Sequence, residues 1–122
     1  MNQPSIHSPN DIHSPLLKLA VESWRFSKIF SRAISKLDAG EQGRFVSQHR
    51  YYLKQLEEHL SAAGFSLVNL EGQPFDPGMA ATPLNIEDFA PEDSLFVDQM
   101  IEPIIMSNGG LVKMGTVILR KG

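Results

Sequence analysis

Apolar residues recur at helical spacing over the first half of the chain and predict two helices. The first helix is expected over about residues 15–37, because Ser14 is a favourable cap and Pro15 suits the first helical position, where no backbone donor is needed. Its apolar stripe repeats every three or four residues, as Phe26, Phe30, Ala33 and Leu37. A second, offset stripe opens with Leu17, Val21 and Trp24.

The segment 38–43 contains two glycines and interrupts this pattern. Beyond it, a second helix is expected over about residues 43–63, ending at Gly64, with an apolar stripe of Phe45, Tyr52, Leu56 and Leu60. Two helices joined by a short loop form an antiparallel hairpin, and a hairpin with two apolar faces is half of a four-helix bundle. The sequence therefore predicts a homodimer whose interface contains Phe26, Phe30, Ala33, Leu37, Phe45, Tyr52, Leu56 and Leu60.

The pattern changes to that of a β structure after Gly64. Residues 65–70 suggest a short strand, and the prolines and glycines of 72–83 exclude a helix there. Residues 84–99 mix acidic and apolar positions and do not define strands. Two β-branched runs, 100–106 and 111–119, flank Asn108-Gly109, which is a strong hairpin signal. Pro103 cannot donate to a ladder, so its strand is expected to lie at an edge or to carry a bulge there.

These elements predict an α+β fold in which a helical hairpin forms a dimeric four-helix bundle and a small all-β head domain follows. Residues 1–14 are polar and proline-containing and are expected to form a disordered tail. Residues 15–64 form the dimerising hairpin, and residues 65–122 form the β domain. A chain of 122 residues, 42% apolar and 20% charged, suits one core of ordinary size with at most a small second unit.

Composition narrows the functional classes. The chain has no cysteine, which removes disulfides and thiolate chemistry and suits a reducing compartment. The polar N-terminus does not resemble a signal peptide, and no apolar run approaches the roughly 18 residues that span a bilayer, so we expect a cytoplasmic protein without a membrane segment. A formal charge of −3, without a Lys/Arg cluster, provides little attraction to nucleic acid.

No arrangement of side chains predicts catalysis. His49 and His59 lie ten residues apart on the second helix without an acidic residue that completes a metal site. The serines lack an activating context, and Gly109-Gly110 leads into a strand instead of a helix N-terminus that could hold a phosphate. We therefore expect no metal, no nucleotide or other cofactor, and no enzymatic activity. Tyr52 is expected in the bundle, whereas Trp24 and Tyr51 fit either a core or a binding surface.

Several segments, in order, resemble the GrpE family of nucleotide exchange factors over about residues 24–122. The segment Gly72-Gln73-Pro74-Phe75-Asp76-Pro77, which follows a helix and a short strand, resembles the start of the family's β domain. Residues 30–34 and 52–56 are similar to the family's paired helices, and residues 112–117 are similar to its final strand. Family members have a long paired helix, or stalk, before this region, whereas Pro9, Pro15 and the polar tail are expected to leave almost no stalk here. Ala80-Ala81 replaces the His-Glu that commonly follows the Phe-Asp-Pro motif, and the hairpin at Asn108-Gly109 is shorter than the family's.

The resemblance implies a homodimer that inserts one β domain into the ATPase domain of an Hsp70-type chaperone and promotes the release of ADP. The positions that match the family's chaperone-binding surface are Arg32, Phe75, Pro77, Lys113 and Leu119. The alternative for Phe75 and Leu119 is a role in the β core, and the alternative for Arg32 and Lys113 is that of solvated surface charges. A different function, that of a dimeric scaffold binding an unrelated protein, is compatible with the missing stalk.

Overall fold

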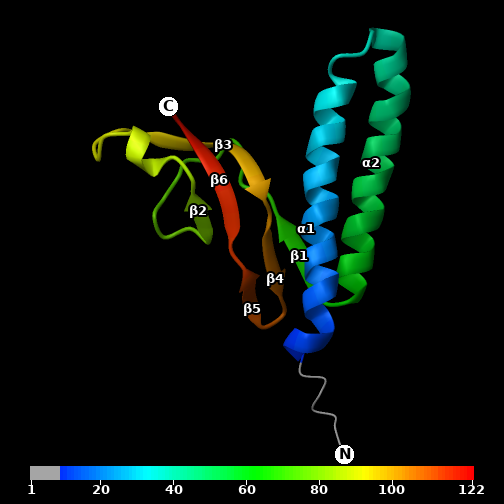
Figure 1. Cartoon of the computed structure of the whole chain (residues 1–122), viewed down its shortest axis with the longest axis horizontal. Helices are drawn as coiled ribbons and strands as arrows, with labels where there is room; N and C mark the ends of the chain where they lie inside the picture. The colour runs from blue at the N-terminus through cyan, green and yellow to red at the C-terminus, as the bar shows by residue number, and fades with distance from the viewer. Residues whose placement is uncertain (1–8) are drawn as a thin grey trace, which may run out of the picture. The chain divides into compact units, whose positions relative to one another are not determined.

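The computed structural model describes residues 9–122, with side chains from residue 15 onward. It confirms an α+β architecture, in which two helices precede a β region of two small sheets (Figure 1). The chain divides into two compact units, with the boundary between Leu56 and Glu57. The part of the predicted tail that covers residues 1–8 lies outside the described residues. Within the described residues, neither helix has an apolar stretch long enough to cross a membrane.

Helix α1 spans Pro9–Ile34, so the predicted start at Ser14-Pro15 is wrong. The same Ser-Pro signal occurs six residues earlier as Ser8-Pro9, and there the proline occupies the first helical position. Pro15 instead lies inside the helix, where its missing N–H removes one backbone hydrogen bond. Residues 9–14, which the sequence assigned to a disordered tail, are therefore helical. The helix also ends three residues before the predicted end at Leu37.

Helix α2 spans Ala39–Ala62 and begins four residues before the predicted start. Asp38 caps this helix, because its carboxylate Oδ1 accepts a hydrogen bond of 3.0 Å from the backbone N–H of Glu41. The cap allows the helix to include Gly40, which the sequence pattern placed in the connection, and to begin before Gly43. The side-chain amide of Gln42 donates to the carbonyls of Ser35 and Leu37 and so satisfies acceptors left free at the end of α1. The predicted antiparallel helical hairpin is present (Figure 1).

Gly64, with a φ of +88°, terminates α2 and leads into strand β1, Phe65–Val68, as the sequence predicted. The β unit contains two three-stranded sheets, with strand orders β1-β4-β5 and β2-β6-β3. The remaining strands are β2 (Ala81–Pro83), β3 (Leu95–Glu102), β4 (Ile104–Ser107), β5 (Gly110–Lys113) and β6 (Gly115–Lys121). A short 3-10 helix, η2, spans Ile86–Asp88 in the region where the sequence did not define strands.

The hairpin predicted at Asn108-Gly109 is confirmed, since Ser107 of β4 pairs with Gly110 of β5. Each long apolar run is divided in two, however, at Pro103 and at Met114. The same pair of segments therefore contributes β3 and β6 to one sheet and β4 and β5 to the other. Pro103 interrupts its strand because it has no N–H for the ladder, and the ladder between β3 and β6 is also irregular between Met100 and Glu102.

The core of the β unit lies near the points where the chain passes from one sheet to the other, between β3 and β4 and between β5 and β6. The most deeply buried side chains there are Val97, Met100, Pro103, Ile105 and Val117. Gly115 opens β6 at this point, and a Cβ atom on it would lie 2.6 Å from Cε of Met100 and 2.9 Å from the carbonyl oxygen of Glu102. The close approach of the two strands therefore requires glycine at position 115.

Candidate functional site

The helical hairpin carries a cluster of aromatic side chains between its two helices. Phe26 and Phe30 lie one turn apart on α1, and their rings stack with centroids 6.3 Å apart. The ring of Phe45 on α2 meets Phe30 edge-on at 6.2 Å. Such offset and edge-to-face pairs contribute about 0.5–1.5 kcal/mol each beyond the area that they bury. The cluster thus helps hold α1 against α2.

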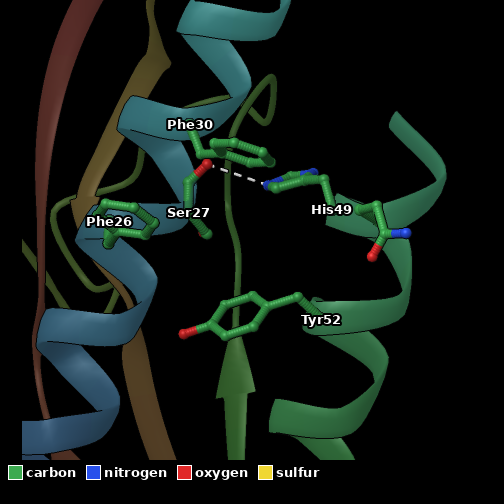
Figure 2. A pocket seen from close by; sticks show the side chains of 6 residues that line it. Phe26, Ser27, Phe30, His49 and Tyr52 are labelled. Carbon is green, nitrogen blue, oxygen red and sulfur yellow. Dashed lines mark hydrogen bonds between the residues drawn. The ribbon is translucent and has the colours of Figure 1, made fainter. Parts of the chain in front are cut away.

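A hydrogen bond crosses from α2 to α1 beside this cluster (Figure 2). The imidazole Nε2 of His49 lies 3.0 Å from the backbone carbonyl oxygen of Ser27, which accepts the bond when Nε2 carries the proton. The imidazole ring also rests against Phe30, with ring centroids 6.0 Å apart. His49 therefore fixes the separation of the two helices through one polar and one aromatic contact.

These side chains surround an open, apolar cavity of about 210 Å³, which we call the hairpin groove. It is lined by Phe26, Ser27, Phe30, Gln48, His49 and Tyr52. Figure 2 shows the Tyr52 ring projecting from α2 toward α1 below His49. Phe26 is 62% exposed and Tyr52 is 39% exposed, although both were expected to be covered in a bundle. A single copy of the hairpin leaves these rings in water.

The structure brings together four of the predicted dimer residues, Phe26, Phe30, Phe45 and Tyr52, around the hairpin groove. Ala33 and Leu37 are exposed further along α1 and its following turn, and Leu56 is half-buried on α2. Leu60 differs, because only 3% of its surface is exposed and it belongs to the same compact unit as the strands. In this structure Leu60 is a core residue and presents no surface to a second copy. Of the aromatic residues left undecided, Trp24 is buried and Tyr51 is exposed.

A second cavity, of about 370 Å³, opens on the β unit, and we call it the β pocket. Phe75 and Pro77, both matched to the family's chaperone-binding surface, line it together with Ile86, Phe89, Ala90, Pro91, Asp93 and Leu95. The backbone N–H of Phe75 donates to the carbonyl of Leu95 over 2.8 Å, so the segment before Pro77 is attached to the start of β3. This bond places the Phe-Asp-Pro motif beside the pocket.

The other three family-matched positions lie elsewhere. Lys113 lies at the end of β5, and its ammonium is 3.0 Å from the carboxylate of Glu102 in a partly exposed ion pair. Leu119 on β6 is 3% exposed, which agrees with a role in the β core and leaves no surface for a partner. Arg32 is exposed in the last turn of α1. Phe75 and Pro77 border the same cavity.

Sequence reasoning missed the role of His49 and the other six of the eight residues that line the β pocket. His49 lies four residues after Phe45 and three before Tyr52, so its helical position already placed it on the apolar face. The β pocket depends on the conformation of residues 86–93, for which no periodic pattern exists. Among the described residues, no group of three or more His, Cys, Asp or Glu side chains is placed to hold a metal ion.

Comparisons with known proteins do not identify a relative. No family model matches the sequence, and no curated protein or solved structure is significantly similar to it.

Proposed function

We propose that this chain is a homodimeric, non-catalytic co-chaperone of the cytoplasm that binds the ATPase domain of an Hsp70-type chaperone and promotes ADP release. The observation that carries the proposal is the position of Phe75 and Pro77. These two residues belong to the motif that most resembles the GrpE family, and both border an open cavity on the β unit that is lined mainly by apolar residues. The chain order also agrees, since a helical hairpin precedes a small β head with two sheets.

Nucleotide exchange requires binding energy and no reacting group. If the protein binds the nucleotide-free ATPase domain better than the ADP-bound domain, linkage requires that it weaken ADP binding by the same factor. A 100-fold weakening needs about 2.7 kcal/mol of differential contact. One well-filled apolar pocket with a few polar contacts at its edge can supply this difference.

The hairpin groove supports the homodimeric part of the proposal. Phe26 and Tyr52 border the groove, and Leu19, Ile29 and Leu37 extend the exposed apolar surface along α1 and its following turn. A second hairpin would bury this surface, at about 25 cal/mol for each Å² of apolar area removed from water. The dimer would present two β units, of which one suffices to bind one chaperone.

Release of a fluorescent ADP analogue from each Hsp70 protein of the source cell, followed by stopped flow, tests the exchange activity. We expect stoichiometric addition of the protein to accelerate release from at least one Hsp70. Phe75→Ala should remove most of the acceleration, whereas Leu111→Ala, at an exposed apolar position on β5, should leave it unchanged. Unchanged release from every Hsp70 would refute the proposal and favour the dimeric scaffold for an unrelated protein.

A further inference from the structure

The charges of the chain are distributed unevenly along the sequence. Between Lys54 and Lys113 there are ten Asp and Glu residues and no Lys or Arg. The residues up to Lys54 have the opposite balance, with eight Lys and Arg against four Asp and Glu. The unit that begins at Glu57 therefore carries a strongly negative charge, although the net charge of the whole chain is only −3.

The β pocket opens within this acidic unit. Hydrogen bonds of backbone N–H groups fix the segments that line it. Phe75, Phe89 and Leu95 are among the residues that line it. The carboxylate of Asp93 accepts a hydrogen bond of 2.9 Å from the backbone N–H of Ala90 and closes the turn over residues 90–93. The backbone N–H of Phe89 donates to the carbonyl of Ile86, which closes η2. The apolar walls are thus held in place without a ligand.

Three further carboxylates lie directly next to pocket-lining residues in the sequence. Glu87 and Asp88 lie on η2 and Glu92 lies in the adjacent turn, and all three side chains are exposed. Among the described residues, no cation forms an ion pair with any of these three. Asp93, by contrast, is paired, because the ammonium of Lys121 lies 3.8 Å from its carboxylate. A cleft with apolar walls and unpaired charges of one sign concentrates the electrostatic potential at its opening.

We propose that the β pocket binds a basic protein segment, in which one large apolar side chain enters the pocket and flanking Lys or Arg residues face Glu87, Asp88 and Glu92. The apolar lining favours an aromatic or aliphatic anchor, and the carboxylates select cations on both sides of it. The same carboxylates repel acidic segments and nucleic acid. The identity of the protein that carries the segment rests on the proposed function, which assigns it to the Hsp70 ATPase domain. The chemistry of the segment does not depend on that assignment.

Titration of the full-length, ¹⁵N-labelled protein with short peptides tests this inference, because amide chemical shifts report weak binding at a defined place. The probe peptide has one central phenylalanine with two lysines on each side. One comparison peptide replaces the lysines with glutamates, and another replaces the phenylalanine with glycine. We expect the probe alone to shift the amide resonances of residues 86–95, and we expect its affinity to fall as salt is raised.

Two double variants that remove the same number of charges distinguish the effect of the carboxylates near the pocket from the effect of the protein's overall charge. Glu87→Gln/Glu92→Gln should weaken binding of the probe by about threefold to tenfold, since two facing charges are lost. Glu57→Gln/Glu58→Gln removes two exposed charges from α2 and should change the affinity much less. Ile86→Ser should weaken binding through the pocket wall, with the other amide resonances unchanged if the fold is kept.

The outcomes distinguish this inference from the proposed function. Shifts confined to residues 86–95 that require both the phenylalanine and the lysines would support the inference, even if no Hsp70 responds in the exchange assay. Equal binding of the lysine and glutamate peptides, or no shift at these residues at millimolar probe, would overturn it. In that case, accelerated ADP release that is lost in Phe75→Ala would still support the exchange factor, with a contact at the β pocket that is not a basic segment.

Discussion

His49 of α2 is hydrogen-bonded through Nε2 to the backbone carbonyl oxygen of Ser27 on α1, at 3.0 Å. Replacing His49 with alanine removes this bond and the contact of the imidazole with Phe30. We expect His49→Ala to lower the free energy of unfolding by about 1–3 kcal/mol, the sum of one net hydrogen bond and one aromatic contact. Urea unfolding measures this change. His59→Ala, at an exposed position of the same helix, serves as the control and should change stability by less than about 0.5 kcal/mol.

Phe26 is the most exposed ring of the hairpin groove, so it provides the sharpest test of the dimer. Phe26→Asp would place a carboxylate in an apolar interface, and we expect it to convert a dimer into a monomer in sedimentation velocity. Leu84→Asp introduces the same charge at an exposed position of the β unit and should leave the dimer intact. A wild-type protein that sediments as a monomer at all concentrations would contradict the dimer prediction.

Gly115 and Gly43 make a pair in which the same substitution should have opposite effects. Gly115→Ala places a Cβ atom 2.6 Å from Met100 and 2.9 Å from the backbone of Glu102, and we expect a loss of about 1–3 kcal/mol in the free energy of unfolding. Gly43→Ala meets no atom within 4 Å in a helix and should gain about 0.5–1 kcal/mol. Thermal and urea unfolding of both variants measures the difference. Equal stabilities would show that the strands at Gly115 can separate without cost.

Asn85 attaches the segment before η2 to β6 through two hydrogen bonds. Its side-chain amide donates to the carbonyl of Leu119 over 3.0 Å, and its side-chain oxygen accepts from the N–H of Leu119 over 2.9 Å. We expect Asn85→Ala to lower the free energy of unfolding by about 2 kcal/mol, because both backbone groups of Leu119 lose their partner. Asn69→Ala removes one exposed, local hydrogen bond to Glu71 and should cost clearly less in the same urea titration.

The extent to which the sequence predicts this structure depends on how local each signal is. Asn108-Gly109 and Gly64 act through their own backbone preferences, so the hairpin and the end of α2 were predictable. The start of α1 was not, because Ser8-Pro9 and Ser14-Pro15 carry the same local signal and only the whole helix distinguishes them. The conformation of residues 84–93 was not predictable either, because the segment has no periodic pattern of apolar residues. Its conformation depends on contacts with distant residues, such as that of Asn85 with Leu119.

The candidate site was predictable to the same extent. Helical spacing grouped Phe26 with Phe30 and Phe45 with Tyr52, and the structure places these four at or beside the hairpin groove, because a helix puts residues at such spacing on one face. Leu119 could not be assigned in this way. Val117, Ile118 and Leu119 are all apolar, so alternation along the strand could not indicate which side chains point inward, and the pairing with β3 decides it.

The division of one long hairpin between two sheets has a consequence for how the β unit unfolds. The segment 95–107 supplies a strand to each sheet, and so does the segment 110–121. Pro103 connects β3 directly to β4, and Met114 connects β5 directly to β6. If both segments leave one sheet, their strands in the other sheet therefore lose their register as well. We therefore expect the two sheets to open as one cooperative unit, with the amides of β4 and β6 exchanging with solvent hydrogen through a common, global event.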